Sequence, residues 1–426
     1  MKIKTNIIRN LFVYLIPIIM VLSQFRMYGF DSHNYLDYIF TILLGFKGFQ
    51  LLIKSVSAEV PRLFAIFLTY CLLTFVAYVI NGVPIRCYYL ALLSFIIPAL
   101  FFYFGYSYCN DESFNKMFMY GSMFCFIIGF YYHFSGNPTY LNMLVEKSSD
   151  SLNANGGLNS DNVLDFVRFG SFFGNSYYIE FFSIPSLILS LSYINSGKID
   201  NRILYIVALV SFIAALLSIQ RIAVGFAFLV PALYLLANDP RKLFRNLLLI
   251  LVLLIIVFIP LYHYISSNAV FESLNEQFST MMERFSISGA MDERKYQYQT
   301  FDRATALSYI FGLGLGSCGH NAHMLGIQSV NDNEYMHLFY EFGILGSLLL
   351  LYPLLKTIFR GVQYRKIYKA ELLIIIYYLA ASLGCDPTDI TYCSFIFWFS
   401  LGRIWNKEYF QLRMIENSQN YIRQQT

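Results

Sequence analysis

Residues 331–355 read NDNEYMHLFYEFGILGSLLLLYPLL, and this stretch decides the fold class. Its first half carries acids, amides and a histidine, whereas the half after Phe342 is almost entirely apolar. An apolar run of this kind is long enough to cross a hydrocarbon core about 30 Å thick. Polar side chains at the start of such a run should face protein or water rather than lipid. The stretch therefore predicts a membrane helix with one polar face at its N-terminal end.

The rest of the chain repeats the apolar pattern. Of 426 residues, 57% are hydrophobic and only 13% are charged, and the mean hydropathy is +0.53. A soluble domain normally carries about 25% charged residues. An open sheet would leave unpaired backbone groups in lipid, and the apolar runs are too long for barrel strands. The sequence predicts an all-α polytopic membrane protein, with residues 1–426 forming a single integral membrane domain.

We expect about twelve transmembrane helices from the apolar runs. They cover 10–29, 36–53, 63–80, 87–107, 117–134, 176–195, 203–220, 222–238, 246–265, 335–357, 371–385 and 391–404. A basic flank precedes the first run, and no small-residue cleavage site follows it. This pattern favours a retained helix over a removed signal peptide.

Lysines and arginines fall mainly on alternate connections between these runs. The positive-inside rule then places both termini in the cytoplasm. Two connections on the outer side are long, 135–175 and 266–334, and loops of this length are usually functional or disordered. Within the second, apolar residues at helical spacing over 278–285 predict an amphipathic helix lying on the bilayer.

Four arginines on the expected outer side are candidates for binding an anion: Arg168, Arg221, Arg294 and Arg303. Guanidinium groups bind phosphate oxygens at two points, so a diphosphate is the natural ligand if the four converge. Arg221 lies in a tight turn at the membrane boundary, where arginine is costly unless it faces a wet or anionic cavity. A snorkelling arginine is the alternative there, and an ion pair with Asp165 is the alternative for Arg168.

In the opening stretch, Asn333, His337 and Glu341 are spaced to share one helix face. Asp332, just before them, has two interpretations. It is either an N-cap acid or a carboxylate that takes a proton from an attacking hydroxyl. Gly343 further along allows a neighbouring segment to come close.

The glycines of FGLGLG (311–316) indicate close backbone packing or a re-entrant turn. No GKS or GKT follows, which argues against a nucleotide site. His320 and His323 have no third ligand marked by spacing, so we expect no metal site and no cofactor. The sequence leaves a disulfide between Cys318 and Cys385 open.

Four local patterns together resemble the O-antigen polymerase and O-antigen ligase superfamily of bacterial cell-surface assembly. They are RFGSFFGNS (168–176), SIQR (218–221), ERK with FGLGLG (293–316) and DNEYMHLFYEFGILG (332–346), in the family's order. The resemblance covers about residues 165–350 and the twelve-span layout. It implies a GT-C-like architecture of the kind used by lipid-linked glycosyltransferases.

The resemblance also implies a function and a location. The protein would act in lipopolysaccharide biosynthesis in the bacterial inner membrane, with its active site facing the periplasm. It would transfer a growing glycan from undecaprenyl diphosphate to a new lipid-linked repeat unit. The implied partners are the undecaprenyl-diphosphate-linked donor and acceptor, membrane lipids and a separate chain-length regulator, without nucleic acid. The lipid diphosphate stores the donor energy, so no cofactor is expected.

Residue roles follow from the resemblance together with the chemistry above. The catalytic candidates are Asp332, Arg221 and Arg294. The substrate-binding candidates are Arg168, Arg303, Asn333, His337 and Glu341, of which His337 and Glu341 are reserve bases.

Ligases of this superfamily typically carry histidine where Asp332 stands here, before the asparagine. This departure favours a polymerase over a ligase that transfers the glycan to a lipid A core. The sequence also leaves open a related polysaccharide polymerase and a transporter without chemistry. Charges gathered at one face, rather than at mid-membrane, favour an enzyme over a transporter.

Overall fold

The computed structural model describes nine segments of the chain. They are residues 35–108, 113–134, 176–196, 201–218, 220–236, 304–323, 325–330, 333–388 and 393–415. These segments contain helices and turns and no strand, which confirms the all-α prediction for this part of the chain. The predicted spans 10–29 and 246–265, the loop 135–175 and the amphipathic helix over 278–285 lie outside the described residues.

Apart from the four-residue α17, the helices lie on apolar stretches of the sequence. Their bounds are α2 Tyr35–Ser55, α3 Glu59–Leu73, α4 Phe75–Ile80, α5 Ile85–Ala91, α6 Ile97–Ala99, α7 Phe101–Ser107, α8 Ser113–Phe134, α10 Ser176–Ser196, α11 Asn201–Ser218, α12 Arg221–Leu236, α16 Ala306–Phe311, α17 His320–His323, α18 Glu334–Gln363, α19 Lys369–Ala381 and α20 Phe395–Trp405. A π-helical turn, Leu92–Ile96, connects α5 to α6.

Among the residues that the structure describes, three helical runs are long and apolar enough to cross a membrane: Glu59–Ala77, Ile85–Ser107 and Glu334–Gln363. Shorter apolar helices cover Tyr178–Ile194, Arg202–Ser218, Arg221–Tyr234 and Phe395–Trp405. The described part of the chain thus has the character of a helical membrane protein.

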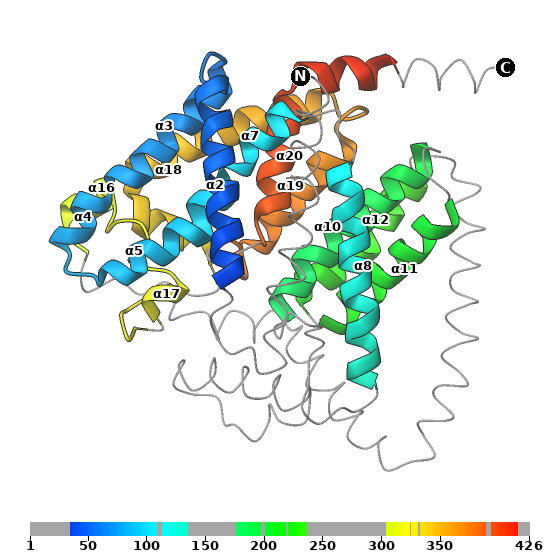
Figure 1. Cartoon of the computed structure of the whole chain (residues 1–426), viewed down its shortest axis with the longest axis horizontal. Helices are drawn as coiled ribbons and strands as arrows, with labels where there is room; N and C mark the ends of the chain where they lie inside the picture. The colour runs from blue at the N-terminus through cyan, green and yellow to red at the C-terminus, as the bar shows by residue number, and fades with distance from the viewer. Residues whose placement is uncertain are drawn as a thin grey trace, which may run out of the picture.

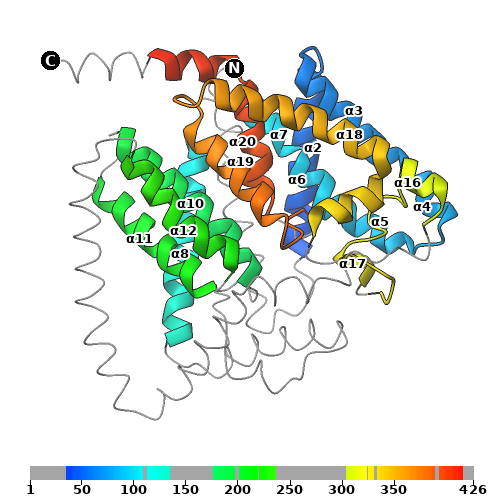
Figure 2. The same cartoon turned by 180° about the vertical axis from the view of Figure 1, so that it is seen from behind.

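The helices form two groups with α19 and α20 between them. On one side α8, α10, α11 and α12 pack together, and on the other lie α3, α5, α16 and α18 (Figure 1). The view from behind shows the same arrangement (Figure 2). Because α19 contacts α10, α18 and α20, it connects the two groups.

Glycines allow α7 and α20 to cross at very short range. A Cβ atom on Gly402 would lie 1.9 Å from the backbone oxygen of Phe102, and one on Gly105 would lie 2.0 Å from that of Phe399. Small residues at such crossings let helix backbones approach closely, as is common in membranes. Around this crossing, the buried Trp398 ring meets the rings of neighbouring helices edge-on, and these contacts form the aromatic core.

Helix α18 bends sharply at Gly343, whose backbone is not helical (φ 66°, ψ −173°). A bend of this kind frees backbone carbonyls, which must find other donors. The glycine-rich segment supplies them: the N–H groups of Leu313 and Gly314 donate to the carbonyls of Tyr340 and Glu341 at 2.8 and 3.0 Å. Figure 2 shows α16 beside the bend.

The predicted close packing of the glycines is confirmed. A Cβ atom on Gly343 would lie 2.4 Å from the backbone oxygen of Ile310, and one on Gly312 would lie 2.1 Å from that of Glu341. Gly346 is equally tight against the ring of Tyr70 on α3, at 2.5 Å. These glycines fix how α18 approaches both α16 and α3.

Basic side chains gather at the end of the helices where α18 finishes and α19 begins. Arg360 stacks on the Trp405 ring at 4.6 Å from its centroid, and Lys369 on the Tyr234 ring at 3.8 Å. The buried Arg403 lies 3.7 Å from the carboxylate of Glu371. Since α18 begins beside the end of α19, this basic end lies opposite the polar mouth of α18.

Candidate functional site

The candidate site forms where three segments meet at the start of α18. The backbone N–H of Glu334 donates to the carbonyl of Ser382 just after α19, at 3.0 Å. The backbone N–H of Val330 donates to the carbonyl of Cys318 at 2.8 Å. This bond brings the glycine-rich turn between α16 and α17 (residues 312–319) alongside. The opening of α18, the end of α19 and this turn thus lie next to one another.

Asn333, rather than Asp332, is the N-cap of α18. Its side-chain oxygen accepts a hydrogen bond from the backbone N–H of Met336 at 3.2 Å, and its own backbone is extended. The capping interpretation of Asp332 is therefore wrong, because the neighbouring amide fills that role. Asp332 itself lies outside the described residues, and its role as a base stays a prediction.

The polar stripe predicted on α18 is buried against protein. Asn333, His337 and Glu341 are 5%, 3% and 2% exposed. His337 Nε2 lies 3.1 Å from Glu341 Oε1, one helical turn away. The same carboxylate oxygen accepts a hydrogen bond from the backbone N–H of Cys318 at 3.1 Å. The glycine-rich turn thus holds the carboxylate that faces the imidazole.

Two further acids, absent from the sequence-based candidates, belong to this site. Glu334 and Asp386 are 3% and 6% exposed. The Glu334 carboxylate accepts a hydrogen bond from the backbone N–H of Thr388 at 3.3 Å and another from the Thr388 hydroxyl. Glu334 could have been found from the sequence, because it precedes His337 by three residues and shares its helix face.

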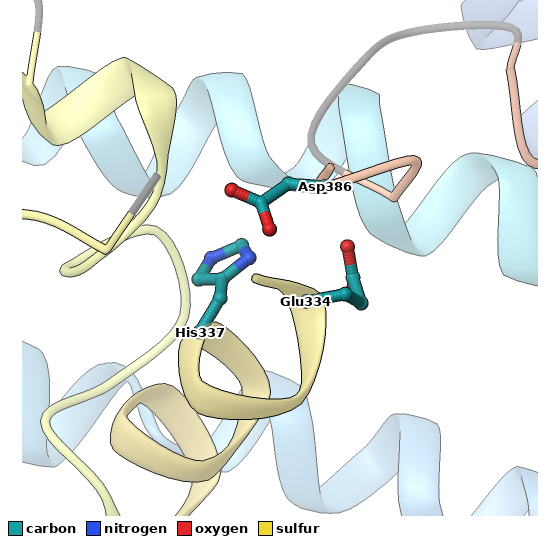
Figure 3. Close-up of side chains that lie close together, drawn as sticks. All are labelled: Glu334, His337 and Asp386. Carbon is teal, nitrogen blue, oxygen red and sulfur yellow. The ribbon is translucent and has the colours of Figure 1, made fainter. Parts of the chain in front are cut away.

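Glu334, His337 and Asp386 each offer a ligand atom, and these atoms lie within 4.8 Å of one another. Figure 3 shows Asp386, from the connection between α19 and α20, pointing toward the His337 ring. Glu334 approaches from the first turn of α18 (Figure 3). These residue types are ligands for divalent metal ions.

Ionisable groups continue from the site toward α10. The Cys385 thiol, next to Asp386, lies 3.5 Å from Glu180 Oε1, and the Tyr377 hydroxyl donates to the Glu180 carbonyl at 3.0 Å. Cys318 and Cys385 both carry thiols and share no disulfide. The site is therefore linked to both helix groups by side-chain contacts.

The structure describes one of the four candidate arginines. Arg221 is the first residue of α12, and it is half-buried. Arg168, Arg294 and Arg303 lie outside the described residues. Their convergence on one anion stays a prediction.

The arrangement at α18 is suited to holding and orienting an imidazole. A carboxylate on one ring nitrogen of a histidine fixes the tautomer and directs the other nitrogen. Here Glu341 takes that position, and the backbone of the glycine-rich turn keeps it in place. Such a group can orient a hydroxyl, accept a proton or bind a metal ion.

Comparison with known proteins assigns no family, since no protein-family model and no curated protein matches the chain.

Proposed function

We propose that the protein is a lipid-linked glycosyltransferase of the O-antigen polymerase type. It joins undecaprenyl-diphosphate-linked repeat units on the periplasmic face of the inner membrane, within a GT-C-like bundle of about twelve spans. The observation that carries the proposal is the buried face of Asn333, His337 and Glu341 at the mouth of an apolar helix. Buried polar groups in membrane helices mark functional sites by default.

The reaction is a glycosyl transfer. A sugar hydroxyl of the lipid-linked acceptor attacks the anomeric carbon of the donor glycan, and a new glycosidic bond forms. The bond between that carbon and the phosphate oxygen breaks, so undecaprenyl diphosphate leaves with the electron pair. The hydroxyl proton passes to a base at the start of α18, for which Asp332 is our first assignment and His337 the second.

The leaving diphosphate gains negative charge in the transition state, so fixed cations speed its departure. We assign Arg221 and Arg294 to this role, with Arg168 and Arg303 binding the same group. The buried stripe of α18 would then place the acceptor hydroxyl. Neither ATP nor a nucleotide sugar is required, because the lipid diphosphate is the activated donor.

Loss of a ligase or of a transporter should give a different phenotype from loss of a polymerase. A ligase would move the finished glycan to a lipid A core, and a transporter would move lipid-linked glycan without chemistry. Deletion of the gene followed by electrophoresis of lipopolysaccharide distinguishes them. A polymerase predicts loss of the ladder with a single repeat unit retained on the core. Loss of all O-antigen would instead indicate the ligase or the transporter, and an unchanged ladder would overturn the proposal.

A further inference from the structure

We infer that Glu334, His337 and Asp386 bind a divalent transition-metal ion, with Mn²⁺ and Zn²⁺ as the best matches. The ion would join the first turn of α18 to the connection between α19 and α20. Ion binding does not rest on the proposed function, whereas a contact between the ion and the substrate diphosphate does.

The ligand set selects the class of metal. Two carboxylates supply hard oxygen donors and one imidazole supplies nitrogen. Carboxylates suit Mg²⁺, Ca²⁺ and Mn²⁺, while imidazole suits Zn²⁺, Fe²⁺ and Cu²⁺. Zn²⁺ binds both donor types in sites with three protein ligands and an open fourth position. A mixed set with oxygen in the majority therefore favours Mn²⁺ or Zn²⁺ over Ca²⁺.

The spacing fits this assignment with a small adjustment. The ligand atoms lie within 4.8 Å of one another, whereas two bonds of about 2.1 Å span at most about 4.2 Å. A small rotation of one carboxylate closes that difference. Ion binding is thus expected to draw α18 and the Asp386 segment together.

The surroundings of the three ligands are those of a constructed metal site. Histidines that bind metals nearly always donate their other ring N–H to a carboxylate or carbonyl. Glu341 lies 3.1 Å from Nε2 of His337 and is itself held by the Cys318 backbone. The backbone N–H of Thr388 likewise donates a hydrogen bond to the Glu334 carboxylate. Figure 3 shows the other side of the imidazole turned toward Asp386.

The charges of the two buried carboxylates also favour a bound cation. Glu334 and Asp386 are buried beside each other, and two carboxylates repel strongly where water is excluded. A divalent cation between them removes that repulsion, and buried charges are stable when they are paired or coordinate a metal.

A bound ion would decide which residue acts as the base in the proposed reaction. With the metal on one ring nitrogen and Glu341 on the other, His337 has no site left for a substrate proton. The base would then be Asp332. The open coordination position could take an oxygen of the leaving diphosphate, which adds a cation to those of the arginines.

The test uses the full chain purified in detergent, stripped with a chelator and titrated with Mn²⁺ or Zn²⁺. We expect about one ion per chain, and Asp386→Asn and His337→Gln should each weaken binding at least tenfold. Both substitutions nearly preserve side-chain volume, and size-exclusion chromatography checks that they fold. Glu59→Gln, at an exposed carboxylate on α3, is the matched control and should bind like wild type.

Pulsed electron paramagnetic resonance of the Mn²⁺ form gives an independent readout. It should show one nitrogen coupling that disappears in His337→Gln. Failure of the wild type to bind either ion, or unchanged binding in both ligand variants, would overturn the site. Loss of metal in Asp386→Asn with a normal lipopolysaccharide ladder would keep the metal site and overturn its link to the proposed function.

Discussion

The imidazole of His337 and the carboxylate of Glu341 lie 3.1 Å apart on adjacent turns of α18. The same carboxylate accepts the backbone N–H of Cys318 from the glycine-rich turn. Two residues later the helix bends at Gly343, and the turn fills the bend. The geometry of the His–Glu pair thus depends on the contact between α18 and the turn.

Glu341→Gln should slow polymer growth by about 10–100-fold, because an amide holds the imidazole less firmly than a carboxylate does. The measurement is the rate of glycan lengthening on lipid-linked acceptor by the purified variant. Metal affinity should fall in the same variant, and a purely structural role would leave it unchanged. If Glu341→Gln keeps both the wild-type rate of glycan lengthening and the wild-type metal affinity, Glu341 has no role in the site.

Gly343→Ala should destabilise the protein by about 1–3 kcal/mol, since an L-residue is strained at this φ and its Cβ would meet the backbone of Ile310. Thermal unfolding in detergent measures the change. Gly225→Ala on α12 is the matched control, because nothing lies within 4 Å of the added Cβ there. Equal midpoints for the two variants would argue against the bend.

The buried Glu371 and the exposed Glu59 offer a second matched comparison. Glu371 lies 3.7 Å from buried Arg403 and accepts a hydrogen bond from the Tyr409 hydroxyl at 2.7 Å. Glu371→Ala should cost about 3–5 kcal/mol, because it leaves a buried guanidinium with less compensation. Glu59→Ala, which loses an exposed pair with Lys356, should cost less than about 1 kcal/mol. Comparable losses of stability in the two variants would show that Glu371 does not compensate the buried Arg403.

Arg221→Ala should abolish chain growth while leaving the protein in the membrane. Arg221→Lys should restore little activity, because an ammonium lacks the two-pronged guanidinium geometry. Electrophoresis of lipopolysaccharide from complemented deletion cells gives the readout, and immunoblotting of membranes controls for expression. A normal ladder from Arg221→Ala would exclude the residue from the site.

Asp332 and Asn333 can be separated by their expected effects. Asn333→Ala should lower stability by about 1 kcal/mol, because α18 loses its cap. Asp332→Asn should leave stability near wild type and abolish glycan lengthening, because an amide cannot take the proton. Full activity in Asp332→Asn would transfer the base to another residue.

The polar stripe could be predicted from the sequence because helical periodicity places i, i+4 and i+8 on one face. The sequence alone places the cap one residue early, because aspartate and asparagine are both good caps and only the backbone geometry distinguishes them. Gly343 and FGLGLG were recognisable as close-packing positions. Their packing against each other is a tertiary contact, and local sequence patterns carry no information about such contacts.

Asp386 could not be predicted from the sequence either, because its contact with His337 is also a tertiary contact. It lies on a different helix connection from His337, and no ligand spacing joins CDPTD (385–389) to the opening of α18. The histidines with a visible spacing are His320 and His323, which belong to another segment. Only the packing of α19 against α18 brings the acid to the imidazole.

Polymerase activity is tested most directly by reconstituting the purified chain in liposomes with undecaprenyl-diphosphate-linked repeat units. Electrophoresis of the released glycans measures product length. The wild type should give a ladder of lengthened glycans, and Arg221→Ala or Asp332→Asn should give a single repeat unit. A single repeat unit from the correctly folded wild type would contradict the proposed function.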